Sequence, residues 1–570
     1  MSRWFLFTLC ALLGLAMLVC GLLMPAHLRA IDDTVLSVAG RGSPSIVDEG
    51  LTLVKEQQLG AAEMCLEVAR QQHLAGTRKL GLAVGNLAME QPELLRWGGA
   101  APLLDRLFGT NDDAATAGTK PITDFLVRDS SRAKVLEFLS TSRQASVQAL
   151  LGCRLLTNTV IFSPSPSASG QALDTAVSLC GLLLEQGRLG FSPAIAEMAA
   201  EANAGKGSQP LEQLLLDLMS LGQRFNWDQL VVFVSQIESP QTLRVLADRV
   251  RNAGKQLPLL FATVRLSGEP AAVGNYLMRY SKTGFNDLAQ SARLGAGALK
   301  AMVAGEKRPH PAPFWNRLTQ YTPFAQFATV AVDYSWRMPW LALGLKWLLY
   351  FSGGFWIAAA GHFMRRPISP LEAPLQVRGF HLAREVLFAF GFLLVVLLLS
   401  EPFLAQQSQR AILPFRLRLS LATLTAPMGK SGPHTLNMND QLYSLLTLLL
   451  FFVLQGLIYT ACMIKLAEIR RQRVVARVKL KLLENEENLF DAGLYLGFVG
   501  TIICLILVSF RIITLSLMAA YSSTSFGIIF VAVLKIFNVR PLRRRLLLEA
   551  EANSAETAAP VTTSGLAASS

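Results

Sequence analysis

Six long apolar runs constrain this chain more than any other feature, and five of them lie C-terminal to residue 338. Each is close to the roughly 20 residues that an α-helix needs to cross about 30 Å of hydrocarbon. Only 16% of the residues are charged and 52% are hydrophobic, whereas soluble proteins are about a quarter charged. The sequence therefore predicts an all-α, polytopic membrane protein with about six transmembrane helices. The runs cover residues 4–24, 340–361, 386–404, 442–464, 492–510 and 512–534.

The first run predicts an uncleaved membrane anchor rather than a secretory signal. It follows Arg3 and is longer than the 7–15 residues of a signal-peptide core. A small-x-small cleavage motif would place Leu28 at a position that needs a small residue. A cleaved signal remains an alternative, as does a lipoprotein signal at Cys20, although the small residue that should precede that cysteine is missing.

Basic residues predict the orientation of the spans. Cations cluster in residues 465–488, after the sixth run, and after the second run, and these regions are separated by even numbers of crossings. Cytoplasmic loops are enriched in Lys and Arg, so both termini are expected in the cytoplasm of a bacterium with residues 31–338 in the periplasm. The four cations of loop 406–441 weaken this orientation without reversing it.

The same clusters explain the net charge of +13, with 53 Lys and Arg against 40 Asp and Glu. Flanks of this kind attract anionic lipid headgroups. Nucleic-acid binding would need a basic face interleaved with aromatic residues or a recognition motif, and the sequence has neither. The lipid bilayer of the inner (plasma) membrane is therefore an expected partner, and nucleic acid is not.

The exported region, residues 31–338, has mostly helical patterning with a 30-residue quasi-repeat between 226 and 305. The dipeptide Ser239-Pro240 is matched 30 residues later by Glu269-Pro270, and Gly254 is matched at the same distance by Gly284. Proline at the start of a helix and glycine at its end predict stacked helix pairs. An irregular helical domain is the alternative. Helical repeats present extended surfaces to other proteins.

No constellation of residues points to catalysis. Six histidines are scattered without metal-ligand spacing, and no HExxH or CxxC motif occurs. In the exported region Cys153 and Cys180 would form a disulfide in an oxidising compartment, or they are buried thiols. We expect no catalytic residue, no metal and no other cofactor.

The last three spans contain two short motifs. The fifth run carries Leu-Gly-Phe-Val-Gly-Thr at 496–501, and the sixth carries Thr-Ser-Phe-Gly at 524–527 and reaches Phe-Asn at 537–538. Residues 442–545 thereby resemble the MotA/TolQ/ExbB family of ion-driven motor channels. The resemblance implies a homo-oligomeric ring around the single-span helices of an envelope partner, and a proton channel. It does not extend to the exported region.

Physical chemistry assigns roles to the same residues. Glycines at 497, 500 and 527 permit close helix packing. Thr501 and Thr524 are hydroxyls in otherwise apolar helices, and the resemblance implies that they line a pore. The alternative is that each bonds its own helix one turn back. The candidate helix-packing residues are Gly497, Gly500 and Gly527, and the candidate pore-lining residues are Thr501 and Thr524.

Departures from the family pattern concern proton transfer. The acidic residue that some members carry five positions before the Thr-x-x-Gly motif is Ala519 here, and Lys535 interrupts the end of the last span. Asp491 is the only carboxylate near either span, so it is the candidate ion relay.

These observations predict an inner-membrane subunit resembling a motor channel, which couples or scaffolds envelope components through its exported domain. The alternative is a non-conducting, membrane-anchored scaffold for protein–protein interaction. The expected parts are an anchor or signal segment (1–30), the exported helical domain (31–338), two transmembrane helices (339–405), an extracytoplasmic loop (406–441), a three-helix membrane domain (442–545) and a disordered cytoplasmic tail (546–570).

Overall fold

The computed structural model describes residues 3–109, 120–164, 170–281, 283–311, 325–364, 378–403, 438–472, 474–509 and 517–558. Apart from two three-residue strands, the regular elements of these residues are helices, so the chain is all-α as predicted. It divides into two compact units. We call Met1–Ala30 together with Phe314–Ser570 the membrane unit, and Ile31–Pro313 the inserted unit.

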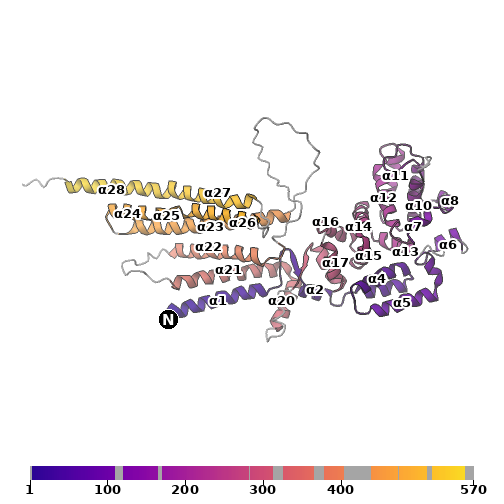
Figure 1. Ribbon diagram of the computed structural model, residues 1–570, viewed down its shortest axis with the longest axis horizontal. Coiled ribbons are helices and arrows are strands. Elements are labelled where there is room, and N and C mark those ends of the chain that lie inside the picture. The colour runs from indigo at the N-terminus through magenta and orange to yellow at the C-terminus, as the bar shows by residue number, and fades with distance from the viewer. Residues whose placement is uncertain are drawn as a thin grey trace, which may run out of the picture. The chain divides into compact units, whose positions relative to one another are not determined.

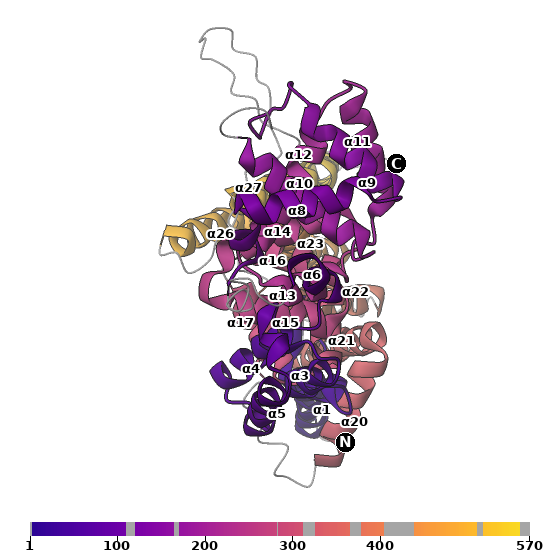
Figure 2. The ribbon, with the colours of Figure 1, turned by 90° about the vertical axis from the view of Figure 1, so that its right-hand side faces the viewer.

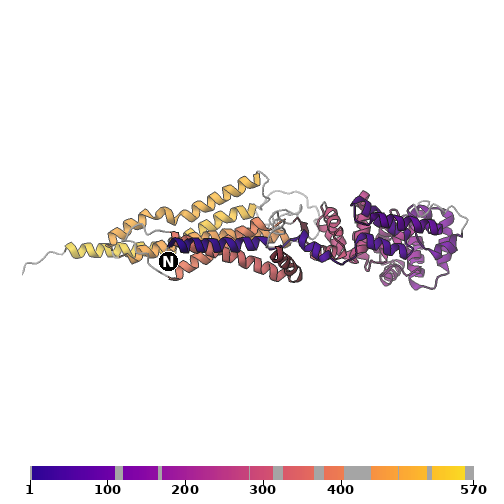
Figure 3. The same cartoon turned by 90° about the horizontal axis from the view of Figure 1, so that it is seen from below.

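Six long helices of the membrane unit pack in a row. Each helix packs on the next in the order α1, α21, α22, α23, α27 and α26. They run alongside one another in both side views (Figures 1 and 3). Their bounds are α1 (Arg3–Leu23), α21 (Pro339–Met364), α22 (Arg378–Ser400), α23 (Met438–Arg471), α26 (Ala492–Ser509) and α27 (Leu517–Val533).

Four helical stretches among the described residues are long and apolar enough to cross a membrane, and a shorter apolar helix covers Ala492–Ile502. Arg511, which separates the fifth and sixth apolar runs, and most of the predicted loop 406–441 lie outside the described residues. The four stretches are Trp4–Leu23, Pro339–Gly361, Leu448–Arg471 and Tyr521–Ala552.

Shorter helices complete the membrane unit: α20 (Ala325–Arg337), α24 (Ala476–Asn485), α25 (Glu487–Phe490), the π-helix η5 (Leu534–Val539) and α28 (Arg540–Ala558). Two of them differ from the predicted domain plan. Because α20 packs on α21, it belongs to the membrane unit rather than to a region reaching residue 338. Helix α28 packs on α24 and buries Leu546, so the chain is helical to Ala558 where a disordered tail was expected.

The inserted unit begins with β1 (Ala30–Asp32), which pairs with β2 (Arg308–His310) near its end. Figure 2 turns the helices of this unit toward the viewer. They are α2 (Asp33–Gly40), α3 (Ile46–Lys55), α4 (Leu59–Gln71), α5 (Thr77–Glu90), η1 (Pro92–Arg96), α6 (Pro102–Phe108), α7 (Ile122–Leu126), α8 (Asp129–Ser140), α9 (Ala145–Gly152), η3 (Cys153–Leu155), α10 (Gln171–Glu185), α11 (Ser192–Asn203), α12 (Gln209–Gly222), α13 (Trp227–Val234), α14 (Pro240–Ala253), η4 (Gly254–Gln256), α15 (Leu257–Ser267), α16 (Pro270–Arg279), α17 (Gly284–Ala292) and α18 (Ala296–Ala304).

Alternate helices of this unit stack on one another. Helices α10, α12, α14 and α16 form one series of neighbours, and α13, α15 and α17 form another. Pro240 and Pro270 open α14 and α16 as predicted, and Gly254 follows α14 with a φ of +53°. Gly284 differs from the prediction because it begins α17 instead of closing α16. The quasi-repeat thus corresponds to stacked helix pairs.

The cysteines of the inserted unit are buried free thiols. Burial raises the pKa of Cys65 and of Cys180 to about 12, and that of Cys153 to about 11. Of the two alternatives for Cys153 and Cys180, the structure has the buried thiols. Because thiolates are the reactive form, these groups are chemically inert at neutral pH.

Candidate functional site

Glycines bring α23, α26 and α27 into close contact. A Cβ atom on Gly497 would lie 2.8 Å from the carbonyl oxygen of Ser523, and one on Gly527 would lie 2.7 Å from that of Gly493. A Cβ on Gly500 would lie 2.6 Å from the Ser523 hydroxyl. Side chains cannot approach a backbone carbonyl this closely, so Gly497 and Gly527 lie at helix contacts without room for a Cβ atom, and Gly500 lies against a hydroxyl. Such small-residue contacts hold membrane helices together by dispersion and short polar contacts.

The two predicted threonines meet at this contact. The hydroxyl oxygens of Thr501 and Thr524 are 2.5 Å apart. Thr501 also donates to the carbonyl oxygen of Gly497, one turn earlier in its own helix, at 3.0 Å. Thr524 reaches the same carbonyl at 3.3 Å. The Thr501 side chain is buried. Both hydroxyls therefore have acceptors within one chain, and the bond one turn back that we considered for each threonine is present for Thr501.

Gln455 of α23 completes what we call the polar seam, together with Thr501, Ser523 and Thr524. Its side chain is 2% exposed, and its amide nitrogen donates to the carbonyl oxygen of Gly493 at 3.0 Å. The amide oxygen is buried without a hydrogen-bond partner among the described residues. We did not predict Gln455. Its signal was a single amide in the middle of the run 442–464, where a polar side chain needs a partner on another helix.

Asp491, the predicted ion relay, is neutralised by a neighbouring cation. The Lys535 ammonium lies 2.8 Å from one carboxylate oxygen of Asp491, and 3.8 Å from Glu487. The lysine that interrupts the last predicted span is therefore the partner of the predicted ion relay.

A second group of charges lies beside α1, α21 and α22. The Lys346 ammonium donates to the carbonyl oxygen of Ala26 at 2.7 Å, and lies 3.2 Å from the His27 ring and 3.9 Å from Glu401. The Glu401 carboxylate accepts a hydrogen bond from the Leu28 amide at 2.9 Å. Lys346 lies near one end of the second apolar run, where a long side chain can extend to the membrane surface. The Lys346 side chain is instead 1% exposed, because its partners are inside the protein.

Helix α1 fits closely against α21 beside this group. A Cβ on Gly14 would lie 2.9 Å from the carbonyl oxygen of Gly353, and one on Gly21 would lie 2.7 Å from the Tyr350 ring. Loss of α1 and the segment after it would leave Lys346 without two of its close partners.

Within the described ranges, no three His, Cys, Asp or Glu side chains are grouped as metal ligands would be. Comparison of the chain with family models, with curated proteins and with solved structures finds no match. The polar seam and the charge group are therefore interpreted from their geometry.

Proposed function

We propose that the protein is a membrane-anchored scaffold of the bacterial cell envelope, which does not conduct ions and which binds other proteins through its inserted unit. The membrane helices hold the inserted unit at the periplasmic face of the inner membrane, with both termini in the cytoplasm. Six spans, assembly into a homo-oligomer and contact with a single-span envelope protein belong to this proposal.

The closure of the polar seam is the observation that carries it. A conducting path needs hydroxyl or titratable groups that are hydrated or free to exchange protons. Here Thr501 is buried and bonded to Gly497, and Asp491 is paired with Lys535. The exposed side chains of α26 and α27 are mostly apolar, as is usual for surfaces that face lipid or another helix.

The surface of the inserted unit supports protein binding. Leu155 and Val160 are 81% and 71% exposed although both are large and apolar. The segment that carries Val160 is fixed, because the Glu212 carboxylate accepts hydrogen bonds from the amides of Val160, Ile161 and Phe162. Exposed apolar side chains that gather in one region are typical of protein-binding surfaces, whereas single ones occur on any surface.

A motor-channel subunit resembling the MotA/TolQ/ExbB family is the second candidate. It is favoured by three polar side chains from three helices, Gln455, Thr501 and Thr524, which bond to carbonyl groups on successive turns of α26. In this case the seam opens when several copies assemble, and Thr524 contributes to the path.

Proton flux into liposomes that contain the purified protein separates the two candidates. We expect no flux above that of empty liposomes, and the same result for Thr524→Val. Ser525→Ala, a change at an exposed hydroxyl of the same helix, is the matched control. Flux that Thr524→Val abolishes and Ser525→Ala preserves would overturn the scaffold proposal and establish the channel.

The binding surface is tested separately by a photo-crosslinking residue placed at Val160 in intact cells. A discrete crosslinked protein is expected, and the same probe at Met89, which is also exposed but lies on α5, should not give that product. Equal products from both positions would show that crosslinking follows exposure alone, and would contradict the proposed surface.

A further inference from the structure

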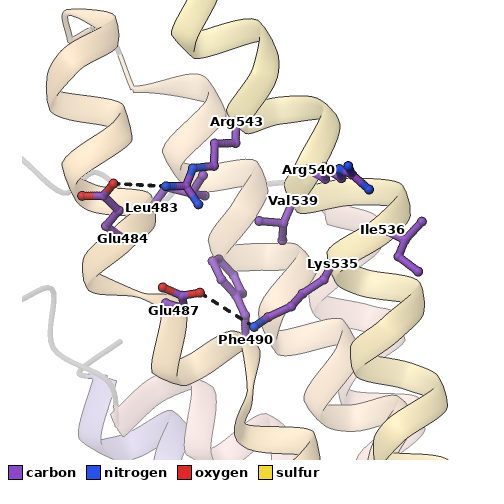
Figure 4. Close-up of a pocket in the computed structure, with 9 residues that line it drawn as sticks. All are labelled: Leu483, Glu484, Glu487, Phe490, Lys535, Ile536, Val539, Arg540 and Arg543. Carbon is purple, nitrogen blue, oxygen red and sulfur yellow. Dashed lines mark hydrogen bonds and ion pairs between the residues drawn. The ribbon is translucent and has the colours of Figure 1, made fainter.

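A groove beside the π-helix η5 has the features of a ligand site. It has a volume of about 220 Å³ and lies between helices α24 and α25 on one side and η5 with α28 on the other. Its walls combine apolar and charged side chains (Figure 4). The apolar lining residues are Leu483, Phe490, Ile536 and Val539, and the charged ones are Glu484, Glu487, Lys535, Arg540 and Arg543.

The π-helix determines which cations face the carboxylates. In an α-helix, each residue is rotated by about 40° around the helix axis relative to the residue four positions before it. This drift would spread Lys535, Val539 and Arg543 around one side of the helix. In η5 the Arg540 amide bonds to the carbonyl oxygen of Lys535, five residues earlier, and this wider turn offsets the drift. Lys535 and Arg543 thus extend toward Glu487 and Glu484 (Figure 4).

Of the three cations that line the groove, Arg540 is the one that can bind an external anion. Lys535 is paired with Asp491 at 2.8 Å, and Arg543 lies 3.4 Å from Glu484. Arg540 is exposed, extends away from both carboxylates of the groove (Figure 4), and has no carboxylate within 4.0 Å among the described residues. An arginine of this kind offers two parallel N–H donors to a phosphate group.

Apolar surface next to Arg540 selects the class of anion. The π-helix begins directly after Val533, the last residue of apolar α27. Ile536 and Phe537 are 54% and 71% exposed, so the apolar surface of the span continues alongside the arginine. A soluble phosphate would use none of this surface, whereas the acyl chain of a lipid would cover it.

We propose that the groove between α24–α25 and η5–α28 binds the headgroup of an anionic phospholipid. Arg540 holds the phosphate, and the acyl chain lies along Ile536 and Phe537. The neutralised pairs of Lys535 and Arg543 form the wall of the site rather than its anion contact. The π-helix, a rare element that is frequent at functional sites, separates the roles of these cations.

Native mass spectrometry of the full-length protein with dioleoyl phosphatidylglycerol tests the proposal. Arg540→Gln should weaken lipid binding by about fivefold, the contribution of one basic residue near an anionic surface. Arg545→Gln removes the same charge from α28 at a position outside the groove and should leave binding nearly unchanged. Equal losses in the two variants would overturn the site and leave only general attraction to the basic helix.

A second arm distinguishes the lipid from a soluble phosphate. Glycerol 3-phosphate should not displace the lipid, and Ile536→Ser should weaken lipid binding while circular dichroism remains unchanged. Displacement by glycerol 3-phosphate, together with an Ile536→Ser variant that binds normally, would show that the anion is soluble and would overturn the lipid assignment.

Discussion

The two units differ in how completely they bury their ion pairs. In the membrane unit, the side chains of Lys346 and Glu401 are both 1% exposed. In the inserted unit, the buried Asp217 carboxylate pairs with Arg251, whose side chain is 35% exposed. Solvent therefore reaches one partner of the second pair and neither partner of the first. Loss of one charge should therefore cost more in the membrane unit than in the inserted unit.

The largest expected effect is at Glu401. Glu401→Ala leaves the buried Lys346 ammonium without its carboxylate, and removal of one partner of a buried pair costs about 3–5 kcal/mol. Unfolding of the purified protein by sodium dodecyl sulfate in mixed micelles would measure the loss.

A double variant provides the control for Glu401. Replacing both charges, as in Lys346→Met with Glu401→Leu, should recover most of the lost free energy because apolar replacements of buried pairs are often neutral. If the double variant is as unstable as Glu401→Ala, the charge pair is not what connects these segments, and the comparison between the units fails at this point.

A packing change in the polar seam should cost less. Gly497→Ala places a Cβ atom 2.8 Å from the carbonyl oxygen of Ser523, and overpacking of this kind costs about 1–3 kcal/mol. Gly344→Ala is the matched control because a Cβ there meets nothing within 4 Å. The same micelle titration should therefore show a loss for Gly497→Ala alone; equal stability of the two variants would contradict the close contact of α26 and α27.

In the inserted unit, the free energy of unfolding should depend on pH through Asp228. Burial raises the pKa of Asp228 to about 7 from its ordinary value of 3.8, so between these values the folded state binds more protons than the unfolded state. The free energy of unfolding should then fall as the pH rises from about 4 to about 7. Asp228→Asn should flatten this slope in thermal unfolding followed by circular dichroism. An unchanged slope would show that Asp228 is ionised throughout this range.

The smallest effect is expected at the threonine pair. Thr524→Val removes one hydroxyl from the bond with Thr501, and such bonds between membrane helices contribute about 0.6 kcal/mol on average. The Thr501→Val and double variants complete a cycle in micelles. A coupling energy much larger than this value would mean that the seam is a structural core of the membrane unit.

Local features of the sequence predicted the helices and part of the seam. Pro240 and Pro270 mark helix starts because proline is favoured in the first turn and its lost N–H is not needed there. Thr501 and Thr524 were found because each is a hydroxyl within a short motif, and they do contact each other. The apolar runs that are long enough to cross a bilayer predicted the long helices for the same reason, because each of these sequence signals lies within one segment.

Features that depend on distant segments were not predicted. His27 and Lys346 are far apart in the chain, and nothing in either segment specifies the other as its partner. The π-helix Leu534–Val539 also has no local signal in the sequence, although Lys535 and Arg543 on either side of it meet carboxylates on α25 and α24. Tertiary contacts decide such details, and they decide which predicted charges are exposed.

The pairing of β1 with β2 has a consequence for modularity. Strands that pair lie about 4.7–4.9 Å apart, so the chain enters and leaves the inserted unit, Ile31–Pro313, at neighbouring points. Units with adjacent ends can be exchanged or excised with a short linker in their place. Replacement of Ile31–Pro313 as one cassette would thus leave the sequence of the membrane helices unchanged.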